Sequence, residues 1–393
     1  MAESRDTNSW ATTIAAATGY AMDGFDFLIL AFSLPAIAQE FHLGPTAGAS
    51  LATSTLVGAV LGGVIFGILA DRYGRIRILT WTIVCFAVFT AVCALAPGYP
   101  FLLVARFLSG LGLGGEFGIG MALVSEAWPR GKTDIMSAFV AIGGQVGVIL
   151  AVFCVTLLMP VIGWRGLFLV GAFPAILAAI FRRKLHDPIR IETGQGNSAF
   201  SFRYFIESRD LWRTSLGIAI LCIVQNCGYY GIIVWMPQFL SDRLHLSLQN
   251  TGIWTVVMLV GMSCGMYTFG LLSEKFRHKT IFVSYMIGAM VTTLLYPHLT
   301  GPTAFLVGGA ILGFFVNGML GGYAALISRR YPVKIRATAQ NMLFNIGRAV
   351  GGFSPVIVSN IDYKFGFYIT ISLFSLLYMI DIISISFIIP ETE

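Results

Sequence analysis

Long apolar runs separated by short polar connections repeat along the whole chain. A helix needs about 20 apolar residues to cross the hydrocarbon core of a bilayer, whereas a membrane-spanning strand shows alternation over about ten residues. Twelve runs have helical length, at approximately 12–38, 48–69, 76–96, 100–124, 135–158, 164–181, 212–240, 250–272, 280–296, 302–328, 336–359 and 364–389. The pattern predicts an all-α integral membrane protein with twelve transmembrane helices.

Composition supports this prediction. Of the 393 residues, 56% are hydrophobic and only 11% are charged, whereas about a quarter are charged in a soluble domain. The 44 glycines suit closely packed membrane helices. All six cysteines fall inside predicted spans, so we expect small buried side chains rather than a disulfide framework.

The basic residues gather on one side of the predicted membrane. The N-terminus and the connections after even-numbered spans hold 20 of the 25 lysines and arginines, and the other connections hold three. The positive-inside rule then places both termini in the cytoplasm, as an even number of spans requires. The net charge of +6 is explained by these connections, so no nucleic-acid partner is expected.

The longest polar connection, 182–211, divides the chain into two sets of six spans. We therefore expect an N-terminal six-helix bundle at 1–181, a cytoplasmic central loop at 182–211, and a C-terminal bundle at 212–393.

The two halves repeat one plan. "GILADRYGR" at 67–75 matches "GLLSEKFRH" at 270–278, and the segment 122–139 matches 325–342, both at a step of 203 residues. Gly58 and Gly62 match Gly261 and Gly265 at the same step. Internal duplication of a six-helix unit is typical of secondary transporters and predicts two pseudo-symmetric bundles.

Ionisable side chains inside membrane spans are costly, and they indicate functional sites. They are Asp23, Asp26, Arg106, Glu116, Arg348 and, nearer one end of its span, Asp381. A rise of about 1.5 Å per residue places Asp26 level with Arg106. This predicts an ion pair, from which a released acid could carry a proton. Asp26 is the first candidate, Asp23 and Glu116 are the others, and a static structural pair is the alternative.

Amides and a second arginine lie near the middle of other spans. Asn341, Asn345 and Arg348 are spaced to share one face of the eleventh span. An arginine fork flanked by amides suits a substrate carboxylate. The other substrate-binding candidates are Gln145, Gln225, Asn226, Tyr229, Tyr230 and Asn317. Helix-to-helix packing is the alternative for each amide.

The connection after the second span holds Asp71, Arg72 and Arg75, which can form a charge cluster at the cytoplasmic edge. Gly67 would let the second span pack closely against a neighbour. Glu126, Arg329 and Arg330 are candidate partners for the cluster. We expect this gate to hold the bundles together on the inside; solvated counter-charges are the alternative.

"GILADRYGRIR" resembles the signature loop of the major facilitator superfamily, with Gly67, Asp71, Arg72, Gly74 and Arg75 at its motif positions. The resemblance extends over the whole chain in span number, central loop and duplication. It implies two six-helix bundles around a central cavity, which rock to give alternating access.

Further motifs narrow the resemblance. "DGFDF" in the first span is similar to a motif of proton-coupled sialic acid and aromatic-acid symporters. "GLGLGGEFG", "SEAWP" and "GWRGLFLVGAFPAIL" are similar to segments of the sialic acid–proton symporters and their carboxylate-transporting relatives. The resemblance implies import of an organic anion with protons, and it carries over Asp23, Asp26, Arg106 and Glu116. "GGQVGVILA" lacks the proline of drug–proton antiporters, which argues against that class.

The expected function is therefore proton-coupled uptake of a carboxylate such as sialic acid, an aromatic acid or a short monocarboxylate. We expect a monomer in the bacterial inner membrane, with protons as the coupling ion and no cofactor. A sugar or polyol porter and an organic anion exchanger are the alternatives. The histidines lie in connections or near span ends, and no P-loop or metal-ligand pair is present in the sequence, so an enzyme is not expected.

Overall fold

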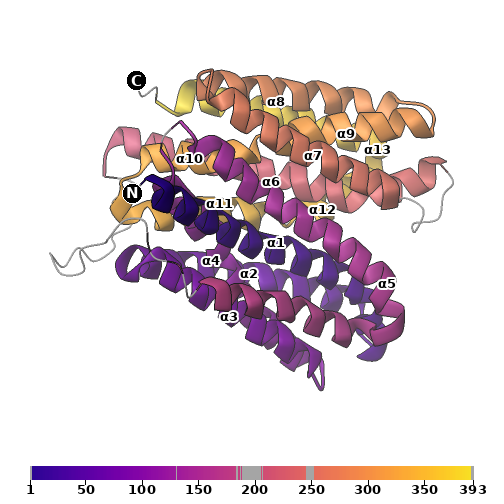
Figure 1. The fold of residues 1–393 in the computed structure, drawn as a ribbon. Coiled ribbons are helices and arrows are strands. Elements are labelled where there is room, and N and C mark those ends of the chain that lie inside the picture. Colours follow the sequence, from indigo (N-terminus) through magenta and orange to yellow (C-terminus); the bar gives the residue numbers. More distant parts are fainter. Residues whose placement is uncertain are drawn as a thin grey trace. The chain divides into compact units, whose positions relative to one another are not determined.

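The described part of the chain is helical and has no strands (Figure 1). This computed structural model describes residues 2–129, 131–182, 185, 187, 205, 207–244 and 252–390, so most of the predicted central loop lies outside the described residues. The helices are α1 Ala2–Glu40, α2 Pro45–Tyr73, α3 Arg75–Ala94, α4 Tyr99–Ala127, α5 Thr133–Arg182, α6 Arg209–Leu244, α7 Gly252–Ser273, α8 His278–Leu295, α9 Pro302–Gly318, α10 Leu320–Arg330, α11 Arg336–Gly351, α12 Ser354–Phe365 and α13 Phe367–Ile383. A π-helix, Ser384–Ile388, follows α13.

Eleven segments of the described residues are long and apolar enough to cross a membrane. One of them, Thr133–Phe173, holds the fifth predicted span and the beginning of the sixth. The two are joined at Gly163, whose φ of 64° is a left-handed conformation that favours glycine. The predicted all-α transmembrane fold is confirmed.

Contacts divide the chain into two compact units. The first comprises Met1–Asn197 with Ile327–Asn345, and the second comprises Ser198–Leu326 with Ile346–Glu393. In the first unit α1 packs against α5 and α4, and α4 also packs against α2 and α3. In the second, α7 packs against α9, and α13 packs against α8 and α6. The predicted bundle boundaries stay a prediction.

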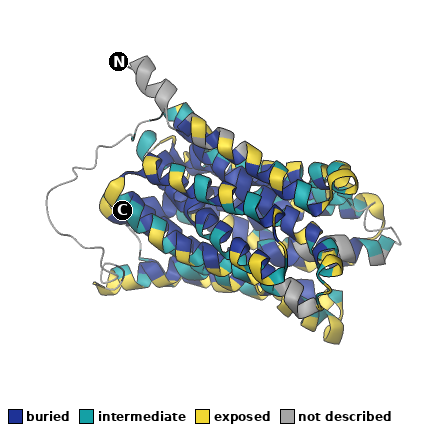
Figure 2. Ribbon diagram, turned by 90° about the horizontal axis from the view of Figure 1, so that it is seen from below, coloured by how far each residue is buried: buried dark blue, intermediate teal, exposed yellow. Residues whose placement is uncertain are grey.

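Each helix carries both buried and exposed residues (Figure 2). In a membrane protein, many of the exposed residues are apolar as well. In α5, for example, the exposed side chains include Leu157, Val161 and Phe173. The opposite side chains of this region, Trp164 and Phe168, are buried in a core cluster with Phe25 of α1. These outward apolar side chains would face lipid.

The duplication is seen in two helix crossings, α2 with α4 and α7 with α9, where glycines of one helix contact the backbone of the other. A Cβ atom added to Gly58 or Gly62 of α2 would lie 2.1 or 2.0 Å from the carbonyl oxygen of Phe107 or Leu111 of α4. Gly261 and Gly265 of α7 would meet the carbonyl oxygens of Ala310 and Phe314 of α9 at 2.1 Å each. Every member of the second set lies 203 positions after its counterpart in the first. Both units therefore use the same glycine-dependent crossing.

Substitution of Gly62 should be poorly tolerated. We expect Gly62→Val to lower the free energy of unfolding by about 1–3 kcal/mol, because the new side chain collides with backbone that has no room to yield. Gly265→Val should have a similar effect. Gly44→Ala is the control, since nothing lies within 4 Å of a Cβ atom there. Thermal unfolding in detergent measures all three; equal midpoints for Gly62→Val and Gly44→Ala would contradict the proposed constraint.

Candidate functional site

A buried ion pair joins α1 and α4 inside the first unit. Asp26 is 2% exposed and Arg106 is 0% exposed. Nη1 of Arg106 donates to both carboxylate oxygens of Asp26, at 3.0 and 2.9 Å. The structure thus places the two side chains together, as the depth estimate predicted. The role of the pair in proton coupling stays a prediction.

The rest of the Arg106 guanidinium is also held. Nε donates to Sγ of Cys93 at 3.1 Å, and Nη2 donates to Oγ1 of Thr90 at 3.3 Å. The guanidinium carbon lies 4.7 Å from the centre of the Phe168 ring. Cys93 and Thr90 could not be predicted from the sequence, because small uncharged residues of an apolar span give no signal of their own. These contacts fix the orientation of the arginine toward Asp26.

Asp23 lies one turn before Asp26 on the same face of α1. Its side chain is also buried, at 4% exposure. The structure therefore keeps both acids of the "DGFDF" motif in the interior of the first unit.

Glu116, the third acid of the predicted coupling site, has a different partner. It accepts hydrogen bonds from Nη1 and Nη2 of Arg182 at 3.1 and 2.9 Å, and from Oγ1 of Thr82 at 2.6 Å. Arg182 also donates to the carbonyl oxygens of Leu79 and Ala15, at 2.6 and 2.7 Å. This network ties α1, α3 and α4 to the end of α5, which favours a packing role for Glu116.

Arg182 lies at the junction of α5 and the predicted central loop. It is the last residue of α5 and is 0% exposed. A buried arginine at this point is stabilised by its carboxylate and carbonyl partners, which lie far away in the sequence.

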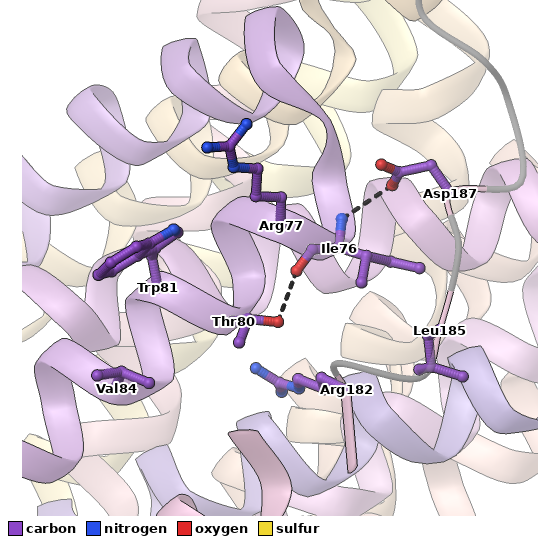
Figure 3. A pocket seen from close by; sticks show the side chains of 8 residues that line it. All are labelled: Ile76, Arg77, Thr80, Trp81, Val84, Arg182, Leu185 and Asp187. Carbon is purple, nitrogen blue, oxygen red and sulfur yellow. Dashed lines mark hydrogen bonds between the residues drawn. The ribbon is translucent and has the colours of Figure 1, made fainter. Parts of the chain in front are cut away.

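A cavity of about 460 Å³ opens beside this network (Figure 3). Its lining residues are Ile76, Arg77, Thr80, Trp81, Val84, Arg182, Leu185 and Asp187. The backbone N–H of Ile76 donates to Asp187 at 2.9 Å, which holds the chain after α5 against the start of α3. None of the predicted coupling or substrate residues lines this cavity.

The loop between α2 and α3 forms the predicted charge cluster. Asp71 accepts hydrogen bonds from the backbone N–H groups of Ala337 and Thr338, at 3.2 and 2.8 Å, and from Oγ1 of Thr338 at 2.7 Å. Because α11 begins at Arg336, this carboxylate caps the first turn of α11 from another helix. Gly67 allows this approach, since a Cβ atom there would lie 3.0 Å from Cα of Thr338.

Arg75 occupies the centre of this cluster. It is 1% exposed, and its Nη2 donates to the carbonyl oxygen of Val333 at 2.6 Å and lies 3.1 Å from both Asp71 and Glu126. Gly74, just before it, has a φ of 103° and is the residue between α2 and α3. The predicted grouping of Asp71, Arg75 and Glu126 is therefore present in the structure.

Arg329 of α10 pairs with Asp134 at 2.8 Å. Glu126 has two cationic neighbours in the described part of the chain, Arg75 at 3.1 Å and Arg336 at 3.5 Å. Arg330 is half-buried at the end of α10, and Arg72 is exposed, with its guanidinium 5.3 Å from the centre of the Tyr73 ring. The gate roles of Arg329 and Arg330 stay predictions. Sequence position does not show which of several nearby arginines reaches a given acid.

The predicted substrate residues are distributed over both units. In the first, Gln145 and Asn341 are buried, and Asn345 donates to the carbonyl oxygen of Gly114 at 2.9 Å. Phe117 and Phe344 stack at 3.8 Å between ring centres. The Asn345 bond joins α11 to α4, which favours helix packing for this amide.

In the second unit, Gln225 donates to Oδ1 of Asn317 at 2.5 Å, and Asn226 donates to the carbonyl oxygen of Cys222 at 2.8 Å. The rings of Tyr229 and Tyr230 lie 5.2 Å apart. Arg348, also in this unit, is 7% exposed. The substrate roles of all these residues stay predictions.

Among the described residues, no group of three or more histidine, cysteine, aspartate or glutamate side chains could hold a metal ion.

Comparison with known proteins identifies the family of this chain. The profile of the Major Facilitator Superfamily matches residues 16–353 and again 239–393. A metabolite transport protein of Haemophilus influenzae is 48% identical, over 100% of this chain and 99% of its own length. The sialic acid transporter NanX of Escherichia coli is 26% identical, over 92% of this chain and 91% of its own length. The cis,cis-muconate transport protein of Acinetobacter baylyi is 28% identical, over 86% and 84%.

A solved structure shares the fold. The proton:xylose symporter XylE superimposes with a TM-score of 0.79 at 17% identity, covering 99% of this chain and 97% of XylE.

Proposed function

Because this chain belongs to the major facilitator superfamily and is a transporter, we propose that it imports an organic carboxylate together with protons. The observation that carries the proposal is the buried pair of Asp26 and Arg106, in which the carboxylate has one cationic partner among the described residues. Relatives named for sialic acid and for cis,cis-muconate support an acid as the substrate.

The proposed coupling follows from the charges. Protonation of Asp26 removes its negative charge and weakens its attraction to Arg106. Arg106 keeps its own charge, because a guanidinium does not lose its proton in a protein. A conformation that separates the two side chains therefore favours proton uptake, and one that reunites them favours release. Asp23, buried one turn away, is the alternative proton carrier.

Substrate binding is assigned to Arg348 in this proposal. Its planar guanidinium can donate two parallel hydrogen bonds to a carboxylate, which a lysine cannot reproduce. We propose a monomer in the bacterial inner membrane with both termini in the cytoplasm, protons as the coupling ion, and no cofactor.

Uptake into proteoliposomes tests the function. With an inward proton gradient, we expect the protein to accumulate at least one acid from a panel of sialic, aromatic and short-chain acids. Collapse of the gradient with a protonophore should abolish accumulation, because no other energy source is present. Protein-free liposomes are the control. Uptake that is indifferent to the gradient but requires an anion inside the liposome would contradict symport and indicate an exchanger.

A further inference from the structure

A further buried acid belongs to the second unit. Asp381 of α13 is 0% exposed. Neither of its carboxylate oxygens has a hydrogen-bond partner within the part of the chain that the structure describes. No described lysine, arginine or histidine forms an ion pair with it. Asp26 and Glu116, by contrast, are each bound by an arginine.

Among the described residues, the ionisable side chains that interact with Asp381 are thiols and phenols. They are Cys222 and Cys227 of α6, Tyr323 of α10 and Tyr378, one turn earlier on α13. The hydroxyl of Tyr323 donates to the carbonyl oxygen of Leu221 at 2.9 Å, so it is already engaged.

Helix α8 also packs against α13, but its described contacts do not supply a counter-charge. Lys279 donates to the carbonyl oxygen of Ser386 at 3.2 Å, and the hydroxyl of Tyr285 donates to Gly265. An ionised carboxylate without a partner in such surroundings would be very unfavourable, whereas the neutral acid costs far less. These surroundings favour the neutral acid over the carboxylate.

Asp381 belongs to a row of polar side chains along an otherwise apolar helix. Ser375, Tyr378, Asp381 and Ser384 recur every three residues, and all four are buried. Ser384 donates to the carbonyl oxygen of Gly217 at 3.2 Å, which directs this end of the row toward α6. Space for the Tyr378 hydroxyl exists because residue 228 is glycine; a Cβ atom there would lie 2.3 Å from the hydroxyl oxygen.

At Ser384, the last residue of this row, the α-helix gives way to a π-helix. The π-helix Ser384–Ile388 begins three residues after Asp381. Such segments interrupt regular helix hydrogen bonding and are frequent at functional sites. The π-helix is therefore a point at which the end of α13 could move relative to α6.

We propose that Asp381 is a second proton-binding site, confined to the second unit and separate from the pair of Asp26 and Arg106. It binds one proton as a neutral carboxylic acid in the conformation described, and it releases that proton to water as a carboxylate when α6 and α13 separate. The assignment of this proton to transport rests on the proposed symport, but its presence on Asp381 does not.

Infrared spectroscopy of the full-length protein in lipid tests the proton itself. At neutral pH, we expect a protonated-carboxyl C=O band that Asp381→Asn removes and Asp26→Asn leaves in place. Asp381→Glu, which keeps an acid at this position on a longer side chain, should shift the band without removing it, and it serves if Asp381→Asn does not fold. Persistence of every protonated-carboxyl band in Asp381→Asn, or an unshifted spectrum for Asp381→Glu, would overturn the site.

Accumulation tests the role in coupling, using an acid that the wild-type protein concentrates. Loss of one coupling proton lowers maximal accumulation about tenfold for each pH unit of gradient. We therefore expect Asp381→Asn to lower maximal accumulation by this factor and to retain downhill uptake. Unchanged accumulation would overturn the coupling role and show that the proton on Asp381 does not take part in transport. Gradient-independent uptake by wild type, with the infrared band intact, would instead refute the proposed symport alone.

Discussion

Replacement of Arg106 by methionine is expected to abolish proton-driven accumulation and to destabilise the protein by about 3–5 kcal/mol, the usual cost of leaving one charge of a buried pair without its partner. The effect should be large because Arg106 is 0% exposed, so its loss leaves the buried carboxylate of Asp26 without its cationic partner. Thermal unfolding and uptake into proteoliposomes measure the two consequences.

The double variant Asp26→Asn/Arg106→Met separates stability from coupling. It removes both charges, so we expect it to recover most of the stability that Arg106→Met loses, while accumulation stays absent. If Asp26→Asn alone concentrates substrate as well as wild type does, the pair is a static structural one.

The chain offers a matched control for this experiment. Glu40 and Arg165 form an ion pair whose side chains are 41% and 38% exposed. Exposed pairs of this kind contribute about 0–1 kcal/mol, since water screens both charges. Glu40→Gln should therefore change neither the unfolding midpoint nor accumulation by much. An equal loss of stability in Glu40→Gln and Arg106→Met would show that burial is not the cause.

Replacement of Asp71 by alanine is the second change expected to have a large effect. It removes the acceptor for two backbone N–H groups and one hydroxyl at the start of α11. Hydrogen bonds to a charged group contribute about 1.5–3 kcal/mol, so we expect uptake to fall about 10- to 100-fold and the unfolding midpoint to drop. Initial uptake rates at equal protein density measure the first effect.

Two variants resolve which part of the contact matters. Thr338→Val removes only the hydroxyl donor and should have a clearly smaller effect than Asp71→Ala. Asp71→Asn keeps one acceptor oxygen but no charge, so it should fall between them. If Asp71→Ala transports at the wild-type rate, the capping contact has no part in the transport cycle.

The sequence predicted the features that depend on local pattern or on depth in the membrane. Apolar run length predicted the helices, and counting residues along two spans predicted that Asp26 and Arg106 meet. It also predicted that Arg75 lies near Glu126, because both belong to charged ends of neighbouring spans. Such features follow from the rise per residue of a helix and from the direction in which each span crosses the membrane.

The sequence did not reveal contacts that depend on tertiary geometry. Arg182 lies at the edge of a basic polar stretch, so nothing in its neighbourhood indicates that Glu116 draws it into the interior. Arg329 and Arg336 are both near the same loop, and only packing decides that Arg336 approaches Glu126. The capping of α11 by Asp71 was missed for the same reason, since helix caps are normally sought within a few residues of the helix itself.

That cap links movement of α11 to the entry of water. The N–H groups of Ala337 and Thr338 belong to the first turn of α11, where no carbonyl of the same helix is available to them. If α2 withdraws, these groups and the carboxylate of Asp71 must all become hydrated. Separation of the two helices is therefore a wetting step, and its rate should depend on how readily water fills the space between them.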